Sequence, residues 1–110
     1  MKNENYLEKI PMRASSIRFG ADEAGIVTLE IENKGVINKV AQTFFKKPKV
    51  SYVHLDKLGS YIWSSLDGEK DVFSLGKEVE EKFGEVAHPL YERLIKYLEI
   101  LSSYQFIIWK

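Results

Sequence analysis

The stretch from residue 55 to residue 68 constrains the fold most, because it predicts a helix with a marked beginning and a marked end. Its apolar residues follow helical spacing and are Leu55, Leu58, Ile62, Trp63 and Leu66. Asp56 stands where a side-chain oxygen can accept the N–H groups that the first helical turn leaves unbonded. The pair Asp67 and Gly68 supplies a left-handed exit that ends the helix.

The side chains of this helix carry no reactive group. Ser60, Ser64 and Ser65 have neither a neighbouring histidine nor a Gly-x-Ser-x-Gly turn, so they are interpreted as residues of the helix surface. Trp63 lies on the apolar stripe and is expected in the core. Gly59 costs roughly 1 kcal/mol relative to alanine inside a helix, which predicts close packing of another backbone or, as the alternative, contact with a ligand.

Three segments that precede this helix are expected to be strands. Residues 16–19 give the first, and a turn over residues 20–25 follows. Residues 26–32 alternate, with Val27, Leu29 and Ile31 on one face and polar residues on the other, which is typical of a half-buried antiparallel strand. Residues 50–55 are rich in β-branched and aromatic residues and give the third strand, which runs directly into the helix.

Two segments lie outside this strand pattern. Residues 1–11 form a polar lead-in, which is expected to dock through Tyr6, Leu7 and Ile10. Residues 36–49 form a basic amphipathic insertion whose helix stops before Pro48. Its apolar stripe is Ile37, Val40, Ala41, Phe44 and Phe45, and its charges are Lys39, Lys46, Lys47 and Lys49. The insertion is either a flap over the sheet or a docking surface for an acidic partner.

Two further helices are predicted after residue 70. Asp71 is placed to cap the second helix, and Gly84 closes it. Its apolar positions are Val72, Leu75, Val79 and Phe83. His88 and Pro89 predict the start of the third helix, with proline at the first helical position, and this helix runs to about Ser103. Residues 106–109 are an apolar run, expected to be a last short strand or a packed tail.

The third helix has an apolar arc wider than a single core contact needs. One stripe comprises Leu90, Leu94, Tyr97, Leu98, Leu101 and Tyr104. Tyr91 and Ile95 extend the arc on one flank. These extra residues either bury against the insertion and the C-terminal tail or form the wall of a groove.

Composition excludes several functional classes. The chain has 110 residues, which favours a single domain over residues 1–110. It has no cysteine, and His54 and His88 have no carboxylate pair at metal-ligand spacing, so we expect no cofactor and no metal. The 16 basic and 16 acidic residues cancel, which argues against nucleic-acid binding. No secretory signal or membrane span is visible, so a cytoplasmic location is expected.

The order of elements favours an α+β fold. Two strands, the insertion, a third strand and three helices predict a winged-helix-like arrangement, with a three-stranded antiparallel sheet on a three-helix bundle.

The sequence from Leu55 to about Leu101 resembles the PqqD family of coenzyme PQQ synthesis. The residues that carry the resemblance are Leu55, Asp56, Leu58, Gly59, Ile62, Trp63, Asp67, Gly68, Val72, Val79, Phe83, Gly84, Arg93, Leu94, Leu98 and Leu101. Proteins of this family are not enzymes. They bind the leader of a ribosomally made precursor peptide and present it to a modifying enzyme, often a radical S-adenosylmethionine protein.

The resemblance implies where such a leader binds. It adds as an extra strand beside the third strand and against the third helix. In this chain the edge is Ser51, Tyr52, Val53 and His54, and the facing wall is Tyr91, Leu94, Ile95 and Tyr97. The insertion at residues 36–49 departs from the shortest family members and lies just before this strand, where it could cover the edge.

Two other functions stay open. A winged-helix DNA-binding regulator would fit the order of helices, although a DNA reader needs more polar side chains along its third helix than Arg93 and Lys96. A small structural subunit could instead dimerise through the apolar flank of the third helix and the tail at residues 106–109. The chain is accordingly expected to be a monomer or a weak homodimer.

Overall fold

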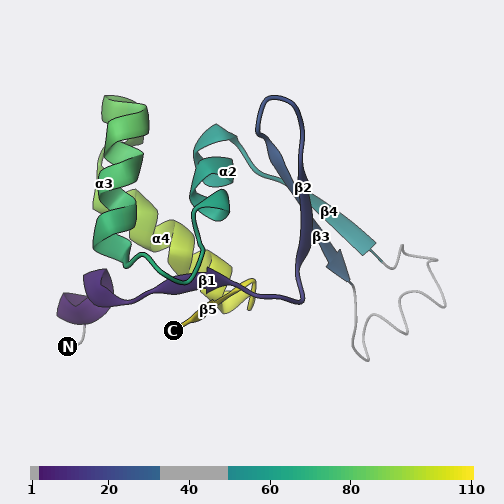
Figure 1. Cartoon of the computed structure of the whole chain (residues 1–110), viewed down its shortest axis with the longest axis horizontal. Coiled ribbons are helices and arrows are strands. Elements are labelled where there is room, and N and C mark those ends of the chain that lie inside the picture. Colours follow the sequence, from purple (N-terminus) through teal and green to yellow (C-terminus); the bar gives the residue numbers. More distant parts are fainter. Residues whose placement is uncertain (1–2, 33–49) are drawn as a thin grey trace.

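A computed structural model describes residues 3–32 and 50–110 of the chain (Figure 1). The described elements are η1 (Asn3–Glu8), β1 (Pro11–Arg13), β2 (Arg18–Ala21), β3 (Val27–Glu32), β4 (Val50–His54), α2 (Lys57–Ser64), α3 (Val72–Phe83), η2 (Gly84–Ala87), α4 (Leu90–Ser103) and β5 (Ile107–Trp109). These elements make an α+β fold in which three α-helices accompany antiparallel sheets. The insertion predicted at residues 36–49 lies outside the described residues.

The larger sheet has the order β2-β3-β4, and both strand pairs are antiparallel. Its core face is the one that the alternation predicted, because Val27 and Leu29 are fully buried and Ile31 packs against the same core. The first strand begins at Arg18 and ends at Ala21, so it lies about two residues later than predicted. The second and third strands confirm the predicted segments.

A second sheet joins the two ends of the chain. In it β1 pairs with β5 in antiparallel register, and Pro11 lies opposite Trp109. The predicted strand in residues 106–109 is therefore confirmed, but β1 was missed because residues 1–11 are polar and end at a proline. Proline is tolerated here because it is the first residue of its strand. Within the lead-in, Tyr6 and Leu7 pack against the core as predicted.

Both predicted aspartate caps are present. The Asp56 carboxylate accepts a hydrogen bond from the Gly59 N–H at 2.7 Å, and Asp71 accepts one from the Ser74 N–H at 2.8 Å. Gly68 has the predicted left-handed backbone, with φ of +80°, but α2 ends earlier, at Ser64. The prediction for Pro89 was wrong by one position, because α4 begins at Leu90 and Pro89 is its N-cap.

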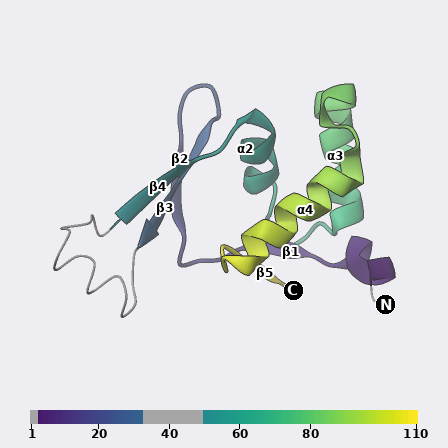
Figure 2. The ribbon, with the colours of Figure 1, turned by 180° about the vertical axis from the view of Figure 1, so that it is seen from behind.

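The core lies between the helices and the inner face of the larger sheet. Trp63, Leu94 and Leu98 are among its buried members, which confirms Trp63 as a core residue. Figure 2 shows α4 running across the molecule from the side of α3 to the two-stranded sheet. Its apolar stripe does not extend into the core as far as predicted, since Tyr104 is 65% exposed. Among the described residues, no helix is long and apolar enough to cross a membrane.

Ser60 is not a surface residue as predicted, because it is only 2% exposed and joins α2 to the sheet. Its hydroxyl accepts a hydrogen bond from the Val27 N–H at 2.8 Å and donates one to the Leu55 carbonyl at 3.4 Å. The Leu55 N–H donates to the Val27 carbonyl at 2.9 Å. In a regular ladder the Val27 N–H would donate back to the Leu55 carbonyl, but here the Ser60 hydroxyl bonds to both of these groups instead. The spacing of serines along a helix could not reveal this contact, because Val27 lies 33 residues before Ser60 in the chain.

We expect the change Ser60→Ala to lower the free energy of unfolding by about 1–3 kcal/mol, because the buried Val27 N–H loses its acceptor. Urea unfolding followed by circular dichroism measures this change. The exposed Ser64 of the same helix is the matched control, and Ser64→Ala should change stability by less than about 0.5 kcal/mol. Equal effects of the two changes would contradict the role given to the Ser60 hydroxyl.

Candidate functional site

The site begins at strand β4, which among the described strands pairs with β3 alone. The bond from the Leu55 N–H to the Val27 carbonyl fixes which residues of the ladder are hydrogen-bonded pairs. In an antiparallel pair such residues alternate with residues whose N–H and C=O groups point away from the partner strand. Tyr52 and His54 are of this second kind, so their backbone groups point to the outer edge of the sheet.

The side chains of β4 lie on two faces of the sheet. Val53 is opposite the buried Leu29, so it lies on the core face, yet it is 39% exposed. Tyr52, opposite Glu30, lies on the outer face and is 61% exposed. His54 also lies on the outer face, where its Nδ1 is 2.7 Å from the Thr28 hydroxyl, as expected for a histidine on a strand surface. Ser51, opposite Ile31, completes the predicted edge.

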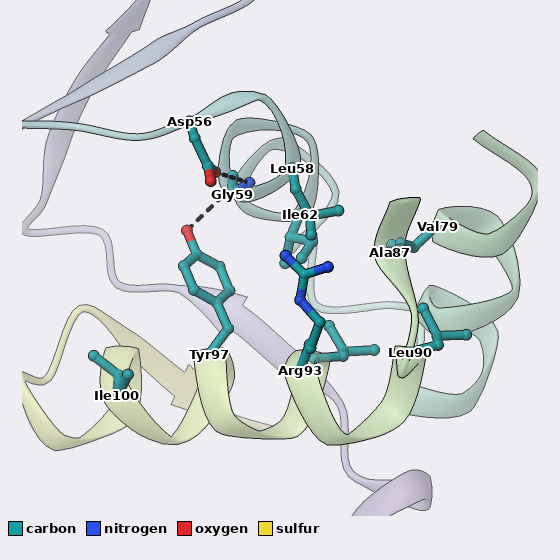
Figure 3. A pocket seen from close by; sticks show the side chains of 11 residues that line it. Asp56, Leu58, Gly59, Ile62, Val79, Ala87, Leu90, Arg93, Tyr97 and Ile100 are labelled. Carbon is teal, nitrogen blue, oxygen red and sulfur yellow. Dashed lines mark hydrogen bonds between the residues drawn. The ribbon is translucent and has the colours of Figure 1, made fainter. Parts of the chain in front are cut away.

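A pocket of about 290 Å³ opens between α2 and α4, directly after the end of β4 (Figure 3). It is lined by Asp56, Leu58, Gly59, Ile62, Val79, Ala87, Leu90, Arg93, Leu94, Tyr97 and Ile100. Most of these side chains are apolar, and Ile100 is 46% exposed at one end of the row. The pocket can therefore take apolar side chains, with few polar groups to orient them.

Tyr97 connects the two helices that form the pocket. Its hydroxyl donates a hydrogen bond to the Gly59 carbonyl at 3.1 Å, while the Asp56 carboxylate accepts from the Gly59 N–H (Figure 3). Burial, together with the nearby Asp56 charge, raises the pKa of Tyr97, so the hydroxyl stays protonated as a donor.

The same contacts explain the glycine inside α2. A Cβ on Gly59 would lie 3.0 Å from the Tyr97 hydroxyl oxygen and 3.0 Å from an Asp56 carboxylate oxygen. The predicted close approach is therefore present, but it is made by two side chains and not by another backbone. Glycine is favoured at position 59 because the Tyr97 hydroxyl and the Asp56 carboxylate both lie against this turn of α2.

Arg93 is the cationic side chain of the pocket lining. Its guanidinium Nη1 donates to the Val86 carbonyl at 2.7 Å, which holds the side chain over the pocket (Figure 3). Asp56 and Arg93 give the pocket one charge of each sign on its lining.

The structure brings together only part of the wall that was predicted on the third helix. Leu94 and Tyr97 line the pocket, whereas Tyr91 and Ile95 do not. Tyr91 faces α3, where its ring stacks on Phe73 at 6.3 Å between centroids and its hydroxyl donates to the Phe73 carbonyl at 3.1 Å. Ile95 is partly buried and lies one helical turn after Tyr91.

Three pocket residues on α4 were not predicted as part of the wall: Leu90, Arg93 and Ile100. Together with Tyr97 they are spaced at i, i+3, i+7 and i+10, so they share one face of the helix. That spacing could have found Ile100, but nothing in the sequence indicates that this face, and not the one with Tyr91, turns toward α2.

Neither histidine of the described residues lines this pocket. His88 Nε2 is 2.6 Å from a Glu80 carboxylate oxygen, and His54 contacts Thr28. In the described stretches, no three His, Cys, Asp or Glu side chains are grouped so that they could hold a metal ion.

Comparison with protein-family models matches residues 26–107 to the family described as coenzyme PQQ synthesis protein D (PqqD). The matched range contains β3, β4, the three α-helices and every residue that lines the pocket. Neither the curated proteins nor the solved structures contain a match to the chain. Because the family match covers well over half of its length, the chain belongs to the PqqD family.

Proposed function

We propose that this chain is a non-catalytic protein that binds the leader of a ribosomally made precursor peptide and presents it to a modifying enzyme, a radical S-adenosylmethionine protein. The family is concerned with coenzyme PQQ synthesis, which is consistent with such a role. The observation that carries the proposal is the position of β4 at the edge of the sheet that the described strands form, beside an apolar pocket.

In this proposal the leader adds as a strand along β4. The outward backbone groups of Tyr52 and His54 pair with the peptide backbone, which gives affinity without regard to sequence. Side chains of an added strand alternate between two faces, so every second one points to the core side, toward Val53 and the pocket. Apolar residues at alternate positions of the leader are therefore preferred.

The polar groups of the pocket support a binding role over a catalytic one. An Asp56 carboxylate oxygen and the Tyr97 hydroxyl are both engaged with Gly59, where they fix the start of α2. Arg93 is held by a backbone carbonyl. These groups shape the pocket, and none of them forms a nucleophile with an adjacent base.

We expect Ile100→Glu to weaken leader binding by at least about tenfold, because it places a charge at the exposed end of an apolar pocket. Fluorescence anisotropy with labelled leader peptide measures the affinity. The matched variant is Ile95→Glu, which would be the more damaging change for binding if the wall of the groove included Ile95, as the sequence predicts. If Ile95→Glu abolishes binding with the fold intact and Ile100→Glu has no effect, the peptide contacts the other flank of α4.

The function itself is tested with labelled leader segments of candidate precursor peptides. The expected result is specific binding of one leader segment and faster modification of its precursor by the partner enzyme when the chain is added. Binding of duplex DNA without peptide binding would support the winged-helix regulator, and a dimer that persists at low micromolar concentration without peptide binding would support the structural subunit.

A further inference from the structure

A second cavity, of about 450 Å³, lies on the other side of α2 from the pocket described above. It is lined by Ala24, Gly25, Ile26, Lys57, Ser60, Tyr61, Ser64, Lys82 and Phe83. In Figure 1 the turn between β2 and β3 and the C-terminal end of α3 lie on either side of α2. We propose that this cavity binds a carboxylate side chain of an acidic peptide segment, with an apolar neighbour of that side chain beside it.

The cavity is separate from the proposed leader site. Its α2 residues are Lys57, Ser60, Tyr61 and Ser64, which share one helix face, whereas Leu58, Gly59 and Ile62 of the first pocket share another. The inference therefore does not rest on the proposed function, and either one can fail without the other.

Two lysines from different helices line this cavity. Lys57 comes from the first turn of α2 and Lys82 from the last turn of α3. Within the described parts of the chain, neither lysine has a carboxylate within ion-pair distance, and Lys82 Nζ lies 5.7 Å from the centroid of the Tyr61 ring. A concave site lined by two positive charges raises the local concentration of anions.

The remaining donors favour a carboxylate over a phosphate. Phosphate sites commonly use a nest of backbone N–H groups, but in this turn Asp22 already accepts from Ala24 and Ile26, each at 2.9 Å. The Gly25 N–H donates to the Asp22 carbonyl, and the Ser60 hydroxyl is engaged with β3. The cavity thus offers its two lysines and the hydroxyls of Tyr61 and Ser64, which suit a singly charged ligand.

The apolar part of the lining favours an apolar residue next to the carboxylate side chain in the bound peptide. Ile26 and Phe83 contribute hydrocarbon surface next to the two lysines. A dipeptide with glutamate followed by leucine presents both chemistries, so N-acetyl-Glu-Leu-amide is a suitable probe, and N-acetyl-Gln-Leu-amide is the same probe without the charge.

The test is a titration of the isotope-labelled full chain with these two dipeptides, followed by amide resonances in NMR spectra at constant ionic strength. We expect saturable shifts at Lys57, Ser64 and Lys82 with the glutamate dipeptide and no saturable shift with the glutamine dipeptide. The change Lys82→Gln should weaken binding ~10-fold, because it removes one charge-assisted contact. Lys77→Gln is the matched control on α3, since Lys77 Nζ lies over the Phe73 ring, and it should leave binding unchanged.

Several results would overturn the proposal. They are the absence of saturable shifts, equal binding of the two dipeptides, equal affinity of the Lys82→Gln variant, and shifts confined to β4 and the first pocket. Tighter binding of inorganic phosphate than of the glutamate dipeptide would replace the carboxylate site with a phosphate site.

Discussion

The change Tyr52→Pro should strongly weaken strand addition at β4 while the domain stays folded. The Tyr52 N–H points away from β3, so proline removes a donor to the added peptide without breaking the β3–β4 ladder. The peptide carbonyl that this donor would satisfy is left without a partner, at a cost of about 1–3 kcal/mol. We therefore expect the affinity for the leader peptide to fall about 5- to 150-fold, measured by fluorescence anisotropy or calorimetry.

Two neighbouring changes separate the backbone effect from other causes. Tyr52→Ala removes the side chain but keeps the N–H, so it should retain most of the affinity if the backbone carries recognition. Val53→Pro removes an N–H that faces β3, opposite Leu29, so it should lower the free energy of unfolding. A Tyr52→Pro variant that folds and binds the leader as tightly as the unchanged chain would exclude strand addition at this edge.

The local signals in the sequence predicted the elements well. Alternation at residues 26–32 and the aspartates at 56 and 71 act over one strand or one helical turn, and the structure has the strand face and both caps as expected. These features depend on residues that are close in sequence, which is why a single sequence is enough to find them.

Features that depend on distant residues were missed or misplaced. Ser60 was assigned to the surface because its partners, Val27 and Leu55, become neighbours only when α2 docks on the sheet. Strand β1 was missed because its pairing partner is at the opposite end of the chain. In both cases the deciding contact is tertiary, and neither periodicity nor propensity contains it.

The candidate site could be predicted only in part for the same reason. The four β4 residues do lie together at one edge of the sheet, and Leu94 and Tyr97 do line the adjacent pocket. The width of the α4 arc indicated two contact faces but not which face meets which neighbour. Tyr91 meets α3 because Gly76 leaves room for its ring, since a Cβ at Gly76 would clash with that ring.

Trp63→Ala should be the most damaging single change to stability. Trp63 is fully buried, with its ring edge-on to Phe19 at 5.6 Å between centroids. Removing a buried tryptophan side chain costs about 3–5 kcal/mol through lost burial and the cavity left behind. Because native domains are stable by only about 5–15 kcal/mol, urea unfolding should begin at much lower denaturant concentration for this variant.

The change Trp63→Phe should lower the free energy of unfolding by much less than the loss of side-chain volume suggests. The indole N–H of Trp63 is buried and has no hydrogen-bond partner among the described residues. Phenylalanine keeps an aromatic ring next to Phe19 and removes this unsatisfied donor, which offsets part of the cavity cost by about 1–3 kcal/mol. We expect a loss of less than about 2 kcal/mol in the same unfolding experiment. If Trp63→Phe is as destabilising as Trp63→Ala, the indole N–H is satisfied in solution, by a water molecule or by a residue outside the described part of the chain.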